Sequence, residues 1–296
     1  MALRAPGERT TTPATTFPAR LERLDSVSST NDVVAGWLRA GQREVCIAVA
    51  DRQTAGRGRL GRSWLAPAGE ALLLSVGFRP SWLAPASLWR LGAIVALAMA
   101  DAAEQVAGLQ DGVVRLKWPN DLVVAFGASE RPLGGASVIG PDAPLHVRKL
   151  AGVLGESDGV GTPDPRAVVG LGLNAGWRRS AFPDELRDQM TSLHDASGGR
   201  PIDRDELLDA FVDRLEPRVE ALRDGWFDVA GWTARQLTNG RPVRLELPDG
   251  RVERHRAVGV DAQTGALLVV DPTVPAGERS VLVGEIQHLR LDEPRV

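Results

Sequence analysis

The apolar residues of this chain fall into short, strand-length runs, and this pattern limits the available folds more than any other feature of the sequence. The runs are EVCIAVADR, ALLLSVGF, VVRLKW, DLVVA, KLAGVLGES and AVVGLGLNAG. Between the second and the third, a longer apolar segment from about Ser87 to Val106 has the length and spacing of a core helix. The sequence therefore predicts a body in which strands and helices alternate.

The two ends of the chain differ from this body. From about Gly240 the sequence consists of short alternating strands joined by Gly and Asp turns, which is typical of a small separate β-barrel. Residues 1–17 are rich in Thr, Pro and Ala and predict a disordered tail. We therefore expect a tail over residues 1–17, a main domain over 18–238 and a small β-domain over 239–296.

Composition excludes several classes of protein. The chain has 296 residues, 43% of them hydrophobic, and a net charge of -3, so no overall positive field draws it to nucleic acid or to a membrane surface. The single cysteine, Cys46, lies in an apolar run and is expected to be a buried structural thiol. The longest uncharged apolar run, Leu91 to Ala100, is too short to span a bilayer. We expect a cytoplasmic protein without nucleic-acid or membrane partners.

A helix start with polar residues follows the first charged segment. Ser28, Ser29 and Thr30 precede an apolar stripe with helical spacing, and Ser29 with Asp32 resembles a capping box. These hydroxyl groups are therefore expected at a helix N-terminus.

The segment DRQTAGRGRLGRSW, from Asp51 to Trp64, alternates glycine with arginine. Glycines let the backbone bend closely around a ligand, and guanidinium groups are suited to bind an anion. A solvated basic turn and an Arg/Gly nucleic-acid segment are the alternatives, and the acidic charge balance speaks against the second. A dinucleotide-binding fingerprint does not fit, because the residues after GRGRLG contain Pro67 and Gly69 and do not continue as a helix.

The chain contains 33 arginines but only two lysines, Lys117 and Lys149. Lys117 opens the segment KWPND, which reads as a strand end followed by a turn, and Lys149 directly precedes LAGVLGE. An ammonium group is a compact charge that can sit among phosphate oxygens, unlike the longer, planar guanidinium group. Unless both survive by chance, the two lysines indicate positions where the chemistry requires an ammonium group.

Taken together, STND, RQTAGRGRLGRSW, KWPND, KLAGVLGE and GLGLN resemble the motifs of the biotin protein ligases, in the same order. The resemblance implies an α+β fold like that of class II aminoacyl-tRNA synthetases and biotin and lipoate ligases, a mixed sheet flanked by helices with a small C-terminal SH3-like barrel. It also implies an activity: these enzymes use ATP and Mg²⁺ to convert biotin to biotinyl-5′-AMP and pyrophosphate. They then transfer biotin to a lysine of the biotin carboxyl carrier domain of acyl-CoA carboxylases.

The resemblance implies roles for individual residues of the main domain. The residues expected to contact biotin are Ser28, Ser29, Thr30, Gln53, Gly56, Arg57, Arg59 and Lys149. Those expected to contact ATP are Arg59, Arg62, Trp64, Lys117, Asn120 and Asn174. The expected catalytic residues are Arg59, Lys117, Asp121 and Lys149, with Asp121 also expected to bind Mg²⁺.

The sequence departs from the family pattern in three places. Leu60 replaces a second arginine that many relatives carry in the glycine loop, so that this loop either has one cation fewer or exposes the position to solvent. Residues 126–147 form a longer insertion than the hairpin of many relatives. Bifunctional relatives carry an N-terminal winged helix, which residues 1–17 cannot accommodate, so we expect a monofunctional ligase that binds no operator.

Two other functions stay open at this level. A lipoate or octanoate ligase would use similar chemistry, although GRGRLGR with the KWPND and KLAG pair looks more like the biotin branch. A binding protein without catalysis, which regulates in response to biotin or a nucleotide, would leave Lys117 and Lys149 without a chemical role. The first alternative predicts that adenylate forms with lipoate or octanoate in place of biotin. The second predicts that no adenylate forms.

Overall fold

The computed structural model of the protein describes residues 16–134, 140, 142–143, 145–283 and 288–291. Residues 1–15 of the predicted tail, and residues 135–139, 141 and 144 of the insertion over 126–147, lie outside the described residues.

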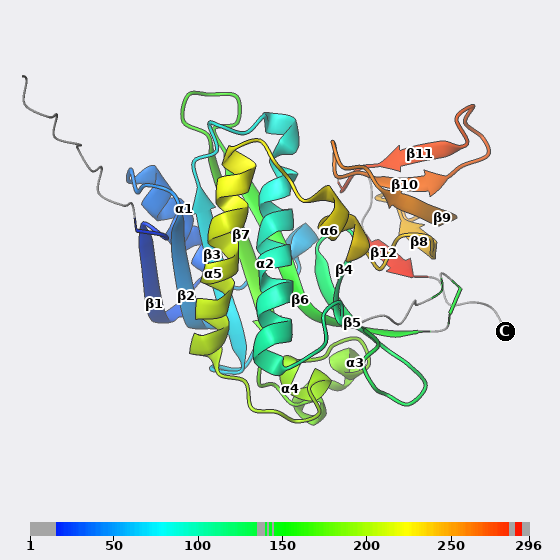
Figure 1. Ribbon diagram of the computed structural model, residues 1–296, viewed down its shortest axis with the longest axis horizontal. Helices are drawn as coiled ribbons and strands as arrows, with labels where there is room; N and C mark the ends of the chain where they lie inside the picture. Colours follow the sequence, from blue (N-terminus) through cyan, green and yellow to red (C-terminus); the bar gives the residue numbers. More distant parts are fainter. Residues whose placement is uncertain (1–15, 135–139, 141, 144, 284–287, 292–296) are drawn as a thin grey trace, which may run out of the picture.

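The main domain is built on a seven-stranded mixed sheet in the order β1-β2-β3-β7-β6-β5-β4 (Figure 1). Strands β1 and β2 pair in parallel, and the other neighbours pair antiparallel. The strands are β1 Arg20–Val27, β2 Cys46–Gln53, β3 Ala71–Phe78, β4 Val114–Lys117, β5 Asp121–Phe126, β6 His146–Asp158 and β7 Arg166–Asn174. The mixed sheet expected from the resemblance is confirmed. Sequence reasoning missed β1, because this edge strand has no buried residue and so lacks the apolar run of a core strand.

Helices cover the two faces of this sheet unequally. The long helices α2 (Trp89–Ala107) and α5 (Arg204–Arg223) lie side by side over one face, as Figure 1 shows. Helix α1 (Thr30–Arg39) packs on β3 and β7. The shorter helices are α3 (Asp184–Arg187), α4 (Leu193–Ala196) and α6 (Val229–Ala234), and single 3-10 turns lie at Arg59–Gly61, Pro85–Ser87 and Arg179–Ala181.

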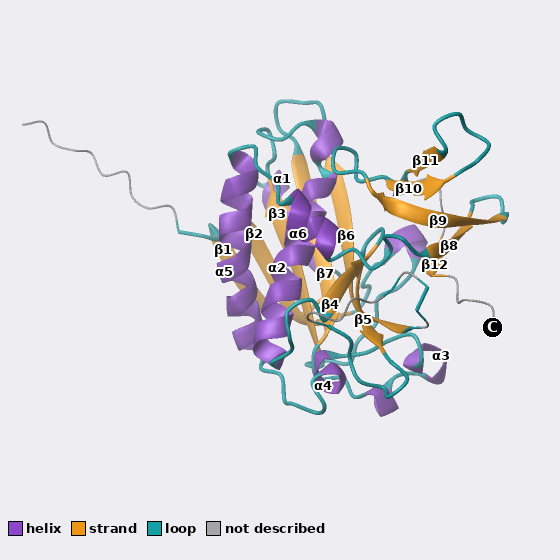
Figure 2. Cartoon of the chain, turned by 45° about the vertical axis from the view of Figure 1, so that its right-hand side comes forward, coloured by secondary structure: helices purple, strands orange, loops and turns teal. Residues whose placement is uncertain are grey.

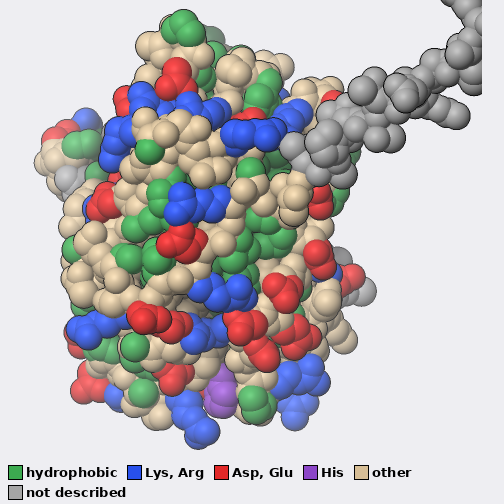
Figure 3. Space-filling view, turned by 90° about the vertical axis from the view of Figure 1, so that its left-hand side faces the viewer, with side chains coloured by type: hydrophobic (Ala, Val, Ile, Leu, Met, Phe, Trp, Pro, Cys, Tyr) green, Lys and Arg blue, Asp and Glu red, His purple; other side chains and the backbone are tan. Residues whose placement is uncertain are grey.

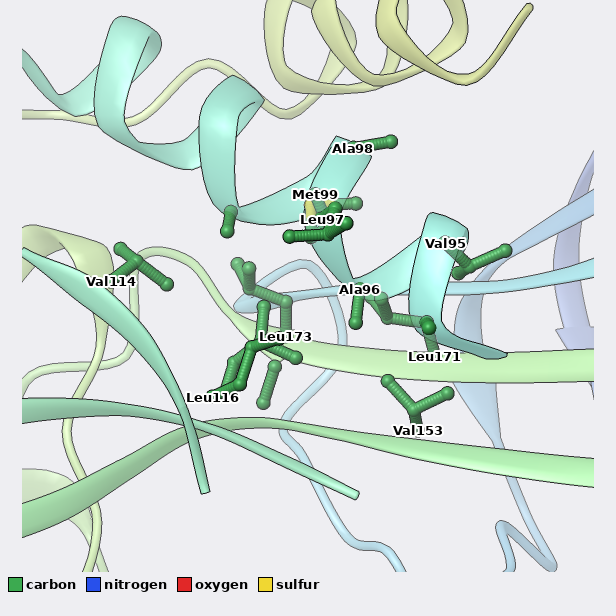
Figure 4. Close-up of a cluster of buried hydrophobic side chains, with 14 of the residues drawn as sticks. Val95, Ala96, Leu97, Ala98, Met99, Val114, Leu116, Val153, Leu171 and Leu173 are labelled. Atoms are coloured by element: carbon green, nitrogen blue, oxygen red, sulfur yellow. The ribbon is translucent and has the colours of Figure 1, made fainter. Parts of the chain in front are cut away.

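The main hydrophobic core lies between α2 and the sheet. Figure 4 shows side chains of α2 above those of β4, β6 and β7, among them Val95, Leu97, Met99, Leu116, Val153 and Leu171. By length and composition alone, Pro85–Ala107 would suffice to cross a membrane. Because most of α2 is buried against the sheet and α5, it is the core helix of this domain.

The C-terminal part forms a separate antiparallel sheet of five strands, in the order β11-β10-β9-β8-β12 (Figure 2). Its strands are β8 Pro242–Glu246, β9 Val252–Val260, β10 Leu267–Val270, β11 Glu278–Val281 and β12 His288–Leu291. The β-structure predicted for this part of the chain is thus confirmed as a separate antiparallel sheet.

Indole groups of the main domain bind backbone carbonyls of the C-terminal part. Trp89 Nε1 donates to Gln263 O at 3.1 Å, and Trp118 Nε1 donates to Gly265 O at 2.9 Å. Gly265 has φ +72°, and a Cβ atom there would lie 2.8 Å from Trp89. The close approach at this turn therefore requires glycine.

The start of α1 differs from the predicted capping box. Ser29 is the N-cap residue, as its position before the apolar stripe indicated, but its side chain makes no capping hydrogen bond. Asp32 turns away and pairs with Arg57 at 2.8 Å. The capping box is wrong because an ion pair with the glycine loop competes for the same carboxylate.

The surface carries both signs of charge. On the side of the molecule that bears β1, acidic and basic side chains are interspersed (Figure 3). That side offers no broad basic face of the kind that binds nucleic acid.

Cys46 is fully buried, as its apolar run predicted. Burial raises the pKa of its thiol from 9.0 to about 11. We therefore expect the thiol of the folded protein to resist alkylation at about pH 8 and to react once urea unfolds the chain. Because the unfolded thiol ionises first, the stability that this group provides below pH 9.0 is lost as the pH rises toward about 11.

Urea unfolding of the wild type and of Cys46→Ala over this pH range isolates the contribution of the thiol. The wild type should lose more stability than the variant between these pH values. Rapid alkylation of the folded wild type would contradict the buried position.

Candidate functional site

A cavity of about 320 Å³ opens on the sheet face that carries α1, beneath the glycine loop. Most of the predicted site residues line it: Ser29, Thr30, Gln53, Arg57, Arg59, Arg62, Trp64, Lys117, Asn120, Asp121 and Lys149. Three do not. Ser28 is exposed, Gly56 is buried within the loop, and Asn174 is buried at the end of β7. The fold thus brings together predicted site residues from four separate motifs.

The two lysines of the chain share one carboxylate. Lys149 Nζ lies 2.6 Å from Asp121 Oδ1, and Lys117 Nζ lies 3.9 Å from Asp121 Oδ2. The β4–β5 hairpin places Lys117 opposite Asp121, while β6 brings Lys149 alongside. Lys117 Nζ also donates to Leu289 O in β12 at 3.0 Å. The ammonium groups are therefore held in place before any ligand binds.

Two cations of the cavity pay a desolvation cost. Burial lowers the pKa of Lys117, although the charge of Asp121 opposes this effect. Burial likewise lowers the pKa of Arg59, whose Nη2 donates to Val283 O at 3.0 Å. A bound anion would offset the cost of burying these positive charges. The electrostatics of the cavity thus favour an anionic ligand.

The floor of the cavity is made of glycine. Gly152 of β6 pairs directly with Gly172 of β7, and Trp64 lies on this pair. A Cβ atom on Gly172 would lie 2.6 Å from the Trp64 ring, and one on Gly152 would lie 3.1 Å from Lys149 Nζ. Side chains at these positions would displace both residues, so the glycines leave the room that the site needs.

The glycine loop is anchored by ion pairs. Arg57 binds Asp32 at 2.8 Å and Glu156 at 3.2 Å, and the hydrogen bond with Asp32 lowers the pKa of that carboxyl group. Arg57 therefore already has two carboxylate partners, unlike the free anion-binding group expected from the resemblance. Leu60, with φ 58°, is 61% exposed, so this position faces solvent.

Some buried polar atoms at the site have no hydrogen-bond partner among the described residues. They are the indole Nε1 atoms of Trp64 and Trp177, which line the cavity, and Oδ1 of Asn174. Asn174 shares its sheet face with Gly172, and its Nδ2 donates to Thr191 O at 3.0 Å. Buried polar groups are normally paired, so such atoms mark places where a ligand or water completes the bonding.

Sequence reasoning missed one wall of the cavity. Trp177, Pro183, Glu185, Leu186 and Met190 line it beyond Lys149. The backbone of this segment pairs with β6, since Lys149 N donates to Gln189 O at 2.7 Å. These residues come from loops and a short helix, and no local pattern indicates where such loops lie. The sequence did carry a signal for the floor, the alternating glycines of GLGLN.

No group of three or more His, Cys, Asp or Glu side chains suited to a metal occurs in the part of the chain that the structure describes. At the predicted magnesium position the cavity offers the carboxylate of Asp121 and the amide oxygen of Asn120, whose Nδ2 donates to Val153 O. Mg²⁺ is commonly held by one or two carboxylates with water and substrate phosphates. The residues present fit that mode of binding.

Replacing Asp121 by Asn should destabilise the protein by about 2 kcal/mol, because two largely buried ammonium groups lose their counter-charge. Urea unfolding measures this change. The matched control is Asp249→Asn, which removes an equally short but exposed ion pair with Arg251 and should leave the midpoint unchanged. Equal effects of the two substitutions would show that Asp121 does not neutralise the lysines.

Comparison with known proteins shows the family of the chain. Residues 24–174 match the Biotin/lipoate A/B protein ligase family. The chain is 32% identical to the biotin–[acetyl-CoA-carboxylase] ligase of Mycobacterium tuberculosis, over 92% of this chain and 90% of that protein. It is 30% identical to the bifunctional ligase/repressor BirA of Escherichia coli, over 83% of this chain and 68% of that protein.

Solved structures give the same result. The biotin protein ligase from Aquifex aeolicus in complex with biotin and ATP is similar to this structure with a TM-score of 0.69 and 26% identity, over 92% of this chain and 99% of that one. The chain therefore belongs to the biotin/lipoate A/B protein ligase family, on its biotin protein ligase branch.

Proposed function

We propose that this enzyme activates biotin with ATP to biotinyl-5′-AMP and then transfers biotin to a lysine of a biotin carboxyl carrier domain. The observation that carries the proposal is the pair of ammonium groups on Asp121, in one cavity with the glycine loop and the polar N-terminus of α1. The similar Aquifex aeolicus ligase binds biotin and ATP, which supports the choice of ligands. We further propose that residues 18–238 form the catalytic domain and that the enzyme acts in the cytoplasm.

In this proposal biotin lies at the α1 end of the cavity. Thr30 and Gln53 form hydrogen bonds with its ureido ring, Ser29 completes this end, and the exposed Ser28 borders it from outside the cavity lining. The Gln53 amide is oriented for this, because its Oε1 accepts from Thr30 N at 2.7 Å and so leaves Nε2 as a donor. The biotin carboxylate then points along the floor toward Lys149.

ATP lies at the other end, with its phosphates between Arg59, Lys117 and Lys149. Trp64 packs beside the adenine. Asn174 is buried outside the cavity lining, and its Oδ1, which has no hydrogen-bond partner among the described residues, is proposed to contact the nucleotide. Arg59 is the first candidate of the loop for the α-phosphate, since it lines the cavity and burial lowers its pKa despite the nearby charge of Asp121, so that a bound anion would stabilise its charge. Arg57 is proposed to reach biotin from its ion pairs, with Gly56 allowing the loop to approach and Arg62 facing the phosphates.

These cations address the main obstacle to the first step. The biotin carboxylate attacks the α-phosphate, so two anions must approach each other, and positive groups fixed in advance reduce that repulsion. Each charge-assisted hydrogen bond contributes about 1.5–3 kcal/mol, so that three or four of them are enough to matter. Pyrophosphate leaves, and the loop covers the adenylate and excludes water from it.

Mg²⁺, if bound with ATP, would be held by Asp121 with Asn120 and would neutralise phosphate charge. The second step needs access more than further activation, because the acyl phosphate is already reactive. The carrier lysine must lose a proton to attack, and Asp121 is the carboxylate of the cavity closest to the two lysines.

Magnesium-dependent ATP–pyrophosphate exchange tests the first step, with biotin, lipoate and octanoate compared in parallel. Biotin alone should support exchange. Lys117→Ala should reduce it at least about 100-fold and Arg59→Gly about 10- to 100-fold, because each removes a cation from the developing charge. Arg251→Ala, in an exposed ion pair away from the cavity, is the control. Exchange with lipoate would assign the lipoate reaction, and exchange with no acid would favour a non-catalytic binding protein.

The glycine floor gives a second test. Gly172→Ala should displace Trp64 and abolish most biotin-dependent exchange, since its Cβ would lie 2.6 Å from the indole ring. Gly155→Ala is the matched control in β6, because a Cβ atom there meets nothing within 4 Å. Thermal unfolding of both variants separates a local effect from misfolding. Full exchange by Gly172→Ala would contradict the proposed position of the nucleotide on Trp64.

A further inference from the structure

Hydrogen bonds connect a row of polar side chains behind the α1 end of the cavity. The ligand-binding and catalytic roles proposed above do not account for these residues. Ser75 of β3 is fully buried, and its Oγ lies 2.6 Å from Asn31 Oδ1 and 2.7 Å from Thr30 Oγ1. Asn31, 4% exposed, donates from Nδ2 to Glu156 Oε2 at 2.7 Å. A Cβ atom on Gly170 would lie 2.3 Å from Asn31 Oδ1, so β7 leaves space for this amide.

The Glu156 carboxylate fixes the orientation of the Asn31 amide. A carboxylate only accepts hydrogen bonds, so the amide group facing it must be the NH₂ group, and the carbonyl oxygen must face Ser75. That oxygen has no hydrogen, so Ser75 must donate to it. Glu156 is itself anchored by Arg57 at 3.2 Å. The direction of the hydrogen bonds in this row is thus set by a charge at its far end.

The number of hydroxyl hydrogens in this network then determines whether Thr30 can donate or accept a hydrogen bond in the cavity. Its hydroxyl lies 2.7 Å from Ser75 Oγ and 3.0 Å from Gln53 Oε1. Ser75 has already given its hydrogen to Asn31, so the two hydroxyl oxygens, 2.7 Å apart, have a hydrogen between them only if Thr30 supplies it. The Thr30 hydrogen therefore serves the shorter contact, to Ser75. Towards the cavity Thr30 presents oxygen lone pairs alone.

We propose that Glu156, Asn31 and Ser75 act as positioning residues that make the Thr30 hydroxyl a strong hydrogen-bond acceptor for an N–H group of the ligand. A hydroxyl that donates toward an anion becomes a better acceptor, because hydrogen bonds in a chain polarise one another. The inference rests on the proposed function, in which this N–H belongs to the ureido ring of biotin. Lipoate and octanoate carry no such group, so this row would favour biotin over both.

The test compares Ser75→Ala and Glu156→Gln with the wild type. Biotin affinity is measured by isothermal titration calorimetry, and the KM values for biotin and ATP by pyrophosphate exchange. Ser75→Ala should weaken biotin binding about 10-fold, since it removes the acceptor of the Thr30 hydrogen. Glu156→Gln should weaken it about 3- to 10-fold, because the neutral amide no longer fixes Asn31. The KM for ATP should change less than about 2-fold in both.

Two controls separate this role from general destabilisation and from loss of the loop anchor. Val76→Ala removes core atoms from the opposite face of β3 and should lower the melting temperature without changing biotin affinity. Asp32→Asn removes the other carboxylate partner of Arg57 but lies outside the row, so it should weaken biotin binding less than Glu156→Gln does. If both substitutions weaken it equally, the effect comes from Arg57 and the proposal fails.

A double-mutant cycle with Thr30→Val completes the test. Once the Thr30 hydroxyl is gone, Ser75→Ala should cost little further biotin affinity. Additive losses would overturn the proposal, and so would unchanged biotin affinity in both single variants. Because the side chain of Glu156 is partly exposed, its variant stays informative if Ser75→Ala fails to fold. A wild-type protein that does not bind biotin would instead refute the proposed function.

Discussion

The site depends on a sheet whose two faces are built differently. On one face, large apolar side chains such as Leu72, Leu74 and Leu171 pack under α2 and α5. On the other, glycines and Ser75 leave a shallow surface beside α1. Because side chains alternate along a strand, the same residues supply a full core on one side and an open floor on the other. The helices fix the sheet, and the glycines give the ligand its room.

A second constraint is that positively charged side chains must be held in the cavity above this floor. Two ammonium groups without a nearby anion would repel each other and pay the full cost of burial. Asp121 offsets this cost, and the tight β4–β5 hairpin holds it opposite Lys117. The C-terminal part of the chain contributes as well, because the carbonyl group of Leu289 in β12 accepts from Lys117, and that of Val283, beyond the end of β11, accepts from Arg59. The small β-domain thereby helps to position cations of the main domain.

The ion pairs of the loop and the row of polar side chains behind α1 meet at one residue. Glu156 binds Arg57 on its loop side and Asn31 on its α1 side. A single carboxylate at the end of β6 thus anchors the glycine loop and orients an amide that leads to Thr30. The position of the loop and the hydrogen-bonding character of the α1 end of the cavity are therefore physically linked.

Elements that arise from local patterns could be predicted from the amino-acid sequence alone. Apolar periodicity indicated the core strands, α2 and the buried Cys46, and the turns indicated the C-terminal β-structure. Their rarity among arginines singled out the two lysines that meet in the cavity. Such patterns failed for edge strand β1, whose residues are too exposed to show a core pattern, and for the capping box at Ser29. Patterns within a short stretch of sequence indicate burial and backbone preference. Neither of these determines the pairing of β1 or the hydrogen bonds at the start of α1.

The tertiary structure decided everything that requires residues distant in sequence to meet. Asp121 between two lysines, the Gly152 and Gly172 pair under Trp64, and the contact of Glu156 with Asn31 each join separate strands, helices or loops. Their partners follow from strand order and register, which no single stretch of sequence encodes. For the same reason the ion pairs of Arg57 could not be foreseen: a side chain takes the nearest opposite charge, and only the fold determines which charge is near.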